Sequence, residues 1–257
     1  MDYELALIDM DGTVYEGDRP VEGVNKALNF LEENDVDIFF LTNYAGRKRE
    51  SYSERLDEMG IDASSDQVVT SGWLTARYIQ ENLPDAEVFV LGEDNLEAEL
   101  RDEEITVMET CDNPDIVVVS DKHDLDYEDL KQVLRGVNKE TILLGTNPDE
   151  TMPVEDGEVP AAGTILKAVE TMTDKEAEVI GKPTDNAVTT VTELADADSR
   201  NCIMIGDKLN IDILMGNRNG METVLVLSGV TDREDIEVSE NSADHVVESI
   251  ADLENVF

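Results

Sequence analysis

The chain has 257 residues, of which 61 are Asp or Glu and 19 are Lys or Arg, so its formal net charge at pH 7 is -42. Such a charge excludes a protein that binds the phosphate backbone of nucleic acids, and it disfavours adhesion to an anionic membrane surface. The hydrophobic fraction of 40% and compact apolar runs such as residues 116–119 exclude a disordered chain. The sequence therefore predicts an ordered core beneath an acidic surface.

Short apolar runs alternate with segments of helical periodicity along the chain. In residues 1–83, the predicted strands cover residues 5–8, 36–41 and 67–70, and the predicted helices cover residues 22–33, 47–59 and 71–82. Ser71 is the predicted N-cap of the third helix. Alternation of this kind is typical of a parallel sheet covered by helices on both faces.

The middle third, residues 84–176, carries its own set of elements. Its predicted strands cover residues 87–91, 105–107, 116–119 and 141–144, and its helices cover residues 95–101, 127–136 and 161–172. Residues 148–160 contain three prolines and are expected to form a long irregular loop. The middle third is therefore predicted to fold as an inserted domain.

Residues 177–257 resume the pattern of the first part. Strands are predicted near residues 179–180, 202–205, 223–227 and 245–247, and helices at residues 186–195 and 210–218. The predicted organisation is a core domain of two parts, residues 1–83 and 177–257, interrupted by a domain over residues 84–176.

The cysteines and histidines give no metal-binding signal. The two cysteines and two histidines lack the spacing of a zinc site. The N-terminus has no cationic signal-peptide start, and no apolar run reaches the roughly 18 residues that span a bilayer. We expect a cytoplasmic protein. The acidic composition favours a cytoplasm rich in salt, which screens the charge repulsion, over a protein that is merely acidic.

Polar residues follow the predicted core strands where each strand ends. In an open parallel sheet, ligands bind beyond the carboxyl ends of the strands. Asp-x-Asp pairs arise by chance in a chain this acidic, but Asp9 and Asp11 directly follow an apolar strand. Carboxylates suit Mg²⁺, and a phosphoryl group held between Mg²⁺ and a lysine could be attacked by Asp9 to form an aspartyl phosphate. The candidate site residues are Asp9, Asp11, Gly12, Thr13, Thr42, Asn43, Lys182, Asp207 and Asp212.

The order of these motifs resembles that of the haloacid dehalogenase superfamily of phosphotransferases. The four motifs are Asp9-x-Asp11-Gly12-Thr13, Thr42-Asn43, Gly181-Lys182-Pro183, and Gly206-Asp207 through Asp212. Residues 70–72 (Thr-Ser-Gly), 145–149 (Gly-Thr-Asn-Pro-Asp) and 180–183 are similar to the NagD-like, 4-nitrophenyl phosphatase subfamily. The resemblance covers essentially the whole chain. It implies a Rossmann-like, doubly wound parallel α/β core with an inserted type 2 α/β cap domain.

The resemblance also implies a Mg²⁺-dependent phosphatase that hydrolyses small phosphomonoesters. Asp9 would be the nucleophile and a Mg²⁺ ligand. Asp11 would protonate the leaving oxygen, then deprotonate the hydrolytic water, and would touch the metal through its backbone carbonyl. Asp207 would be a further metal ligand.

The remaining candidates would bind the phosphoryl group or support the site. By the same resemblance, Thr42 and the backbone of Asn43 would hydrogen-bond the phosphoryl oxygens. Lys182 would bridge the phosphate and Asp9, and Asp212 would support the metal site. Substrate choice would rest on the cap, where residues 120–123 and 147–152 are candidates.

Two other functions fit parts of this pattern. A phosphotransferase would pass the phosphoryl group to another alcohol instead of water. A receiver-like signalling module also combines an acidic Mg²⁺ pocket with a Thr and a Lys, but it is about half this length and has no inserted domain. The sequence leaves the particular phosphate ester and the oligomeric state open.

Overall fold

The computed structural model describes residues 3–154 and 157–257. The chain divides into two compact units. The first unit consists of Met1–Thr42, Arg49–Val69 and Lys182–Phe257, and the second consists of Asn43–Lys48 and Thr70–Gly181. The second unit includes all of residues 84–176, and the assignment of an inserted domain with those boundaries stays a prediction.

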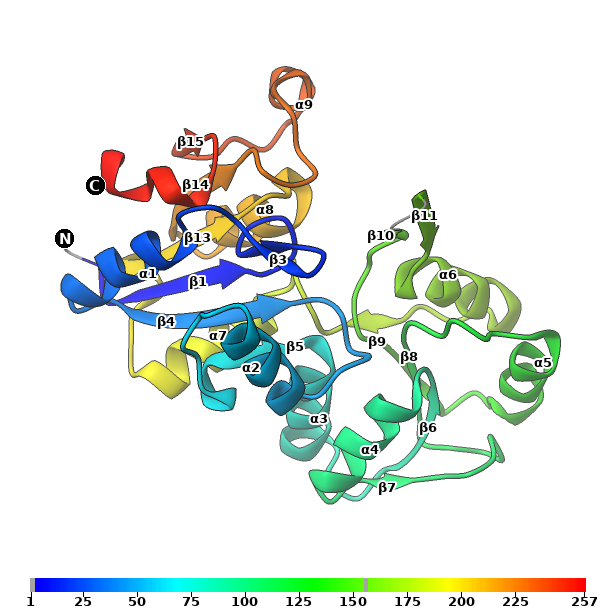
Figure 1. Ribbon diagram of the computed structural model, residues 1–257. Helices are drawn as coiled ribbons and strands as arrows, with labels where there is room; N and C mark the ends of the chain where they lie inside the picture. The colour runs from blue at the N-terminus through cyan, green and yellow to red at the C-terminus, as the bar shows by residue number, and fades with distance from the viewer. Residues whose placement is uncertain (1–2, 155–156) are drawn as a thin grey trace. The chain divides into compact units, whose positions relative to one another are not determined.

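The first unit is built on a six-stranded sheet with the order β15-β14-β13-β1-β4-β5 (Figure 1). Strand β1 (Leu5–Asp9) pairs in parallel with β13 (Cys202–Gly206) on one side and with β4 (Asp37–Thr42) on the other. All five residues of β1 are buried, which explains its nearly continuous apolar sequence. The remaining strands are β14 (Glu222–Val226), β15 (His245–Val247) and β5 (Val68–Thr70).

Helices connect these strands. Helix α1 (Val24–Glu33) buries Val24, Ala27, Leu28 and Leu31, which recur every three or four residues on one face. The other helices are α2 (Arg49–Glu58), α7 (Asp185–Ala195), α8 (Leu214–Arg218) and α9 (Arg233–Val238). A short hairpin of β2 (Tyr15–Glu16) and β3 (Arg19–Pro20) follows β1, and a π-helical turn, Leu209–Ile213, precedes α8. Single 3₁₀ segments cover Ser65–Gln67, Ser199–Asn201 and Ile250–Asn255.

The second unit has its own parallel sheet, with the order β12-β9-β8-β6-β7 (Figure 1). Its strands are β6 (Glu87–Leu91), β7 (Thr106–Val107), β8 (Ile116–Val119), β9 (Ile142–Gly145) and β12 (Glu178–Val179). Val117 and Val119 of β8 pack with Leu166 of α6 in its apolar core. The helices are α3 (Ser71–Asn82), α4 (Asp94–Asp102), α5 (Tyr127–Gly136) and α6 (Ala162–Thr173). Among the described residues, no helix has both the length and the apolar character needed to cross a membrane.

Two predictions from the sequence are wrong in this unit. Helix α3 begins at Ser71, and its N-cap is Thr70, whose Oγ1 accepts a hydrogen bond from the Trp73 backbone amide at 3.0 Å. Residues 148–160 are not one irregular loop, because β10 (Thr151–Val154) and β11 (Gly157–Pro160) pair there in antiparallel fashion. A two-stranded pair has open edges that tolerate proline, so the prolines did not exclude strands. Residues 155 and 156 of the expected loop lie outside the described residues.

Candidate active site

Strands β4, β1 and β13 are neighbours in the sheet of the first unit (Figure 1), and a predicted site residue lies at or directly after the carboxyl end of each. Strand β1 ends at Asp9, which pairs in register with Leu41, the residue before Thr42 at the end of β4. On the other side of β1, β13 ends at Gly206, directly before Asp207. Because parallel strands end at the same edge of a sheet, these side chains converge there.

Lys182 is a buried cation at this edge, with 3% of its surface exposed. Its Nζ donates hydrogen bonds to Asp9 Oδ1 and, at 2.8 Å, to Asp212 Oδ1. Burial by itself would lower the pKa of Lys182, but the adjacent Asp212 and Asp9 carboxylates outweigh burial and raise this pKa. The ammonium therefore stays charged at neutral pH.

Asp9 is the carboxylate that Lys182 contacts at the end of β1. Burial raises the pKa of Asp9 well above its ordinary value, and Lys182 opposes this rise. The negative charges of Asp212 and Asp207 raise the pKa further. Further positive charge near Asp9 would therefore favour its ionised form.

Asp207 is a fully buried carboxylate. Its Oδ2 accepts a hydrogen bond from the Val230 backbone amide at 2.7 Å, whereas its buried Oδ1 has no hydrogen-bond partner within the described residues. Burial and the charge of Asp212 raise the pKa of Asp207 to about 6. A buried oxygen of this kind is suited to bind a cation.

The carboxylates of Asp9, Asp207 and Asp212 fit a divalent metal ion. Each presents an oxygen within 4.8 Å of the other two. Three carboxylates around one ammonium leave excess negative charge in a buried place, and hard oxygen donors of this type are the ligands that Mg²⁺ takes. The carboxylate of Asp11 is not a member of this group, and the predicted contact of its backbone carbonyl with a metal stays a prediction.

The turn after β1 brings the backbone close to Asp207. Gly12 has a φ of 84°, and a Cβ on it would lie 2.6 Å from Asp207 Oδ2, so a larger residue would clash. Ser228 Oγ donates a hydrogen bond to the Gly12 carbonyl at 2.7 Å. Thr13 is fully buried. Gly12 therefore allows the turn after β1 to approach Asp207 closely, and the buried Thr13 is the next residue of this turn.

Asp11 lies on the exposed side of this turn, next to two residues that the sequence analysis missed. The Tyr15 hydroxyl donates a hydrogen bond to Asp11 Oδ2 at 3.3 Å, and the Arg55 guanidinium lies 4.5 Å from the centre of the Tyr15 ring. Although the residue is exposed, desolvation of its carboxyl raises the pKa of Asp11, and Arg55 and Tyr15 oppose the rise. Tyr15 follows Asp11 by four residues, but no sequence pattern connects Asp11 to Arg55.

The structure brings part of the predicted set together in the first unit. Thr42 is buried at the end of β4, and Asn43, the next residue, belongs to the second unit. The grouped residues are Asp9, Lys182, Asp207 and Asp212, with Asp11, Gly12 and Thr13 on the adjoining turn. The predicted substrate-selecting residues 120–123 and 147–152 lie in the second unit, and their role stays a prediction.

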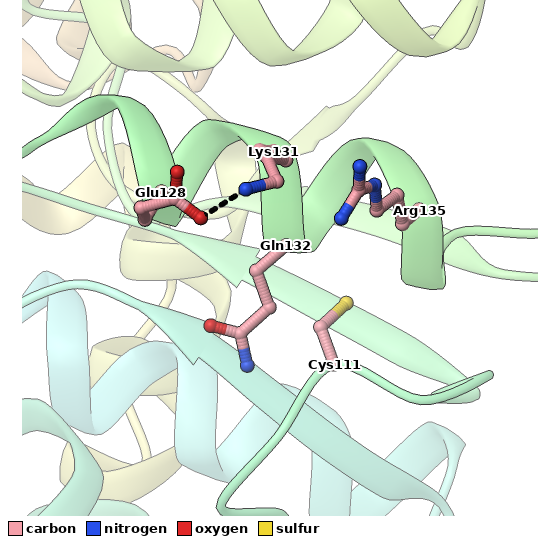
Figure 2. Close-up of a pocket in the computed structure, with 5 residues that line it drawn as sticks. All are labelled: Cys111, Glu128, Lys131, Gln132 and Arg135. Carbon is pink, nitrogen blue, oxygen red and sulfur yellow. Dashed lines mark hydrogen bonds and ion pairs between the residues drawn. The ribbon is translucent and has the colours of Figure 1, made fainter.

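A cavity of about 330 Å³ in the second unit is lined by none of the predicted site residues. Figure 2 shows that four of its lining side chains come from α5 and that Cys111 comes from the loop before β8. Lys131 is paired with Glu128 on the same helix. Burial raises the pKa of the Cys111 thiol to about 11, so it is not a thiolate nucleophile at neutral pH.

Comparisons with known proteins identify the family of this chain. Residues 6–106 match the family model of haloacid dehalogenase-like hydrolases, and residues 179–253 match a second, HAD-hydrolase-like model. An acid sugar phosphatase of Staphylococcus aureus is 33% identical over 235 residues, which cover 91% of this chain and 90% of that protein. The chain therefore belongs to the family of haloacid dehalogenase-like hydrolases.

Solved structures give the same result over the whole chain. A p-nitrophenyl phosphatase from Archaeoglobus fulgidus superposes with a TM-score of 0.94 at 30% identity, covering 100% of both chains. A glycerol phosphate phosphatase from Mycobacterium tuberculosis, solved in complex with magnesium, has a TM-score of 0.90 at 27% identity and covers 98% of this chain and 76% of its own. The predicted family, the Rossmann-like α/β fold and the activity of a phosphoric monoester hydrolase are confirmed.

In magnesium-free buffer at about pH 8, Asp207→Asn is expected to raise the free energy of unfolding by up to about 3 kcal/mol, because the pKa of Asp207 lies about two units above its ordinary value. A raised carboxyl pKa gives a contribution to stability that is present below about pH 4 and is lost as the pH rises through about 6. The difference between variant and wild type should therefore vanish below about pH 4. Urea unfolding across this pH range measures it.

The control is Asp57→Asn, which changes an exposed carboxylate on α2 in the same unit and should have little effect. Added Mg²⁺ should stabilise the wild type more than Asp207→Asn, because a carboxamide is a weaker ligand than a carboxylate. An Asp207→Asn protein no more stable than the wild type at about pH 8 would contradict the role given to the buried charge.

Proposed function

We propose that this protein is a Mg²⁺-dependent phosphatase that hydrolyses small phosphomonoesters through an aspartyl phosphate on Asp9. The observation that carries the proposal is the buried ammonium of Lys182, held between Asp9 and Asp212. Close to it lies Asp207, whose Oδ1 has no hydrogen-bond partner in the part of the chain that the structure describes. Phosphoryl transfer depends mainly on positioning and on neutralising charge. At the end of the parallel strands, the Asp9 carboxylate would supply the nucleophile, and the Lys182 ammonium would be a partner for the phosphoryl oxygens.

In the first step, an oxygen of Asp9 would attack phosphorus, so that a new O–P bond forms as the ester O–P bond breaks. Lys182 already contacts Asp9 Oδ1 and would offset the negative charge of the phosphoryl oxygens. The Thr42 hydroxyl and the Asn43 backbone amide would donate hydrogen bonds to those oxygens. These contacts would hold phosphorus in line with Asp9.

Asp11 would act as the general acid and base. It would give a proton to the leaving oxygen, and in the second step it would take a proton from the water that attacks phosphorus and releases Asp9. The raised pKa of Asp11 favours the protonated form that the first step requires. Tyr15, which donates to Asp11 Oδ2, would keep this carboxyl in place.

Asp9 and Asp207 would hold Mg²⁺ through their carboxylates, and Asp11 through its backbone carbonyl. When bound, Mg²⁺ supplies positive charge that neutralises the phosphoryl oxygens. Asp212 would act in support, because its Oδ1 accepts from Lys182 and its Oδ2 accepts from the Lys208 backbone amide at 3.1 Å. The magnesium complex of the glycerol phosphate phosphatase supports this choice of metal.

The substrate is proposed to be a small phosphate ester. The similar proteins are named for sugar phosphate, p-nitrophenyl phosphate and glycerol phosphate, which share only the phosphomonoester group. We place the selection of the alcohol part in residues 120–123 and 147–152. We also propose that the protein works in a salt-rich cytoplasm, where salt would ease the approach of an anionic substrate to a chain of charge -42.

Phosphate release from 4-nitrophenyl phosphate tests the proposed chemistry. With Mg²⁺ in about 2 M KCl, the wild type should release inorganic phosphate, and EDTA should abolish the release. Asp9→Asn should lower kcat on the order of 10³-fold or more, because a carboxamide cannot form the acyl phosphate. Asp57→Asn is the matched control and should keep full activity. Metal-independent turnover, or an Asp9→Asn variant as active as the wild type, would overturn the proposal.

Activity should rise as KCl is increased from about 0.1 M to about 1 M, where the Debye length falls to about 3 Å and the repulsion among 61 acidic side chains is screened. Thermal unfolding in the same KCl series should show a parallel rise in Tm. Sucrose, which stabilises folded proteins without screening charge, is the control and should not reproduce the gain in activity. An activity maximum below about 0.1 M KCl would contradict adaptation to a salty cytoplasm.

A further inference from the structure

Three sequence motifs that have no role in the proposed phosphoryl-transfer steps meet around Asn43 in the second unit. They are residues 70–72, residues 145–149 and residues 180–181. Asn43 directly follows Thr42, and Gly181 directly precedes Lys182, so these motifs adjoin two residues proposed to handle the phosphoryl group. We call the following set the Asn43 cluster: Asn43, Ser71, Thr146, Asn147, Asp149 and Gly181.

The backbone carbonyl of Asn43 accepts two side-chain hydrogen bonds in this cluster. Ser71 Oγ donates to it at 2.5 Å, and Asn147 Nδ2 donates to it at 2.7 Å. Ser71 and Asn147 are both buried, with 0% and 2% of their surface exposed. Both lone pairs of one carbonyl are thus used by side chains from distant parts of the sequence, which fixes the orientation of that peptide unit.

The side chain of Asn43 is held as well. Asn43 Nδ2 donates to Asp149 Oδ2 at 3.0 Å, and the Asp149 backbone amide donates to Asn147 Oδ1 at 3.0 Å. Asn147 therefore donates its amide hydrogen to the Asn43 carbonyl and accepts with its amide oxygen from Asp149. Residues 147–149 thus hold both the backbone and the side chain of Asn43.

The same cluster also contacts Gly181, the residue directly before Lys182. The Gly181 amide donates to the Thr146 carbonyl at 2.8 Å. A Cβ on Gly181 would lie 2.5 Å from that carbonyl oxygen, 2.8 Å from Asn43 Oδ1 and 3.0 Å from Ser71 Cβ. Only glycine fits at this distance, so the close approach of Gly181 to the cluster depends on the absence of a side chain.

We propose that Ser71 and Asn147 are positioning residues for phosphoryl binding. Ser71 and Asn147 hold the Asn43 carbonyl while Asp149 holds the Asn43 side chain. Together these contacts would limit the movement of Asn43, and thereby of its backbone amide and of the adjoining Thr42. The contacts of Gly181 hold the backbone directly before Lys182. The inference rests on the proposed function, because it gives these residues their effect through groups that bind the phosphoryl oxygens.

The size of the effect follows from the tolerance of phosphoryl transfer to misplacement. A shift of about 1 Å in a positioned group can lower a rate by about 10²-fold, even when the changed residue lies away from the chemistry. Each substitution removes one of the two donors to the Asn43 carbonyl and keeps the other. It should therefore loosen Asn43 without unfolding the unit. We therefore expect Ser71→Ala and Asn147→Ala each to weaken phosphoryl binding by about 10- to 100-fold.

The experiment measures the inhibition constant of orthovanadate, a phosphoryl analogue, with kcat and KM for 4-nitrophenyl phosphate and the Tm of each variant. The control is Thr141→Val, which removes another buried hydroxyl-to-carbonyl bond in the same unit, that of Thr141 Oγ1 to the Pro114 carbonyl at 2.9 Å. Ser71→Ala removes a single oxygen atom, so this variant alone tests the positioning role if Asn147→Ala does not fold. A structural role alone would lower Tm and leave the inhibition constant of the folded protein unchanged.

We expect Ser71→Ala and Asn147→Ala to raise the vanadate inhibition constant and to lower kcat/KM, while Thr141→Val changes neither by more than about twofold. Vanadate inhibition and kcat/KM within twofold of the wild type in Ser71→Ala would overturn the inference and leave the phosphatase itself intact. A wild type that releases no phosphate is a different result, and it would overturn the proposed function.

Discussion

The charge balance around Lys182 is the constraint on which the rest of the site depends. One buried ammonium contacts Asp9 and Asp212, and Asp207 lies close enough to share a metal ion with both. Burial makes uncompensated negative charge costly, and the raised pKa values of Asp9 and Asp207 express this cost. One ammonium and three carboxylates leave excess negative charge, which a divalent cation would offset. The arrangement is therefore suited to hold a divalent cation.

The parallel sheet of the first unit makes this crowding of charges possible. Strands β4, β1 and β13 are neighbours, so residues that are far apart in sequence reach one edge of the sheet. Close approach of the backbone then depends on glycine, as at Gly12, where a Cβ would overlap Asp207 Oδ2. In the second unit, Gly181 plays the corresponding part beside Asn43. The strands and the glycine-containing turns thus place the polar groups.

The sequence predicted much of this because the signals are local. The apolar runs of β1, β8 and β13 and the polar residues directly after the core strands could be read without a structure. Contacts between residues that are distant in the sequence could not be predicted. Nothing in the sequence connects Arg55 to Tyr15 and Asp11, and nothing indicates that Ser71 and Asn147 bind one carbonyl. Helix α9 was missed because it buries none of its residues, although Asp232 and Asp235 form a capping box there.

The central claim is that Asp9 carries the phosphoryl group during turnover, and trapping that intermediate tests it most directly. Protein quenched during steady-state turnover with Mg²⁺ would be treated with borohydride, which reduces an acyl phosphate to the alcohol, and the modified residue would be located by mass spectrometry. The account predicts homoserine at position 9, dependent on substrate and absent when EDTA is present. Turnover with Asp9 unmodified and a reduced carboxylate elsewhere, for example at Asp207, would contradict it.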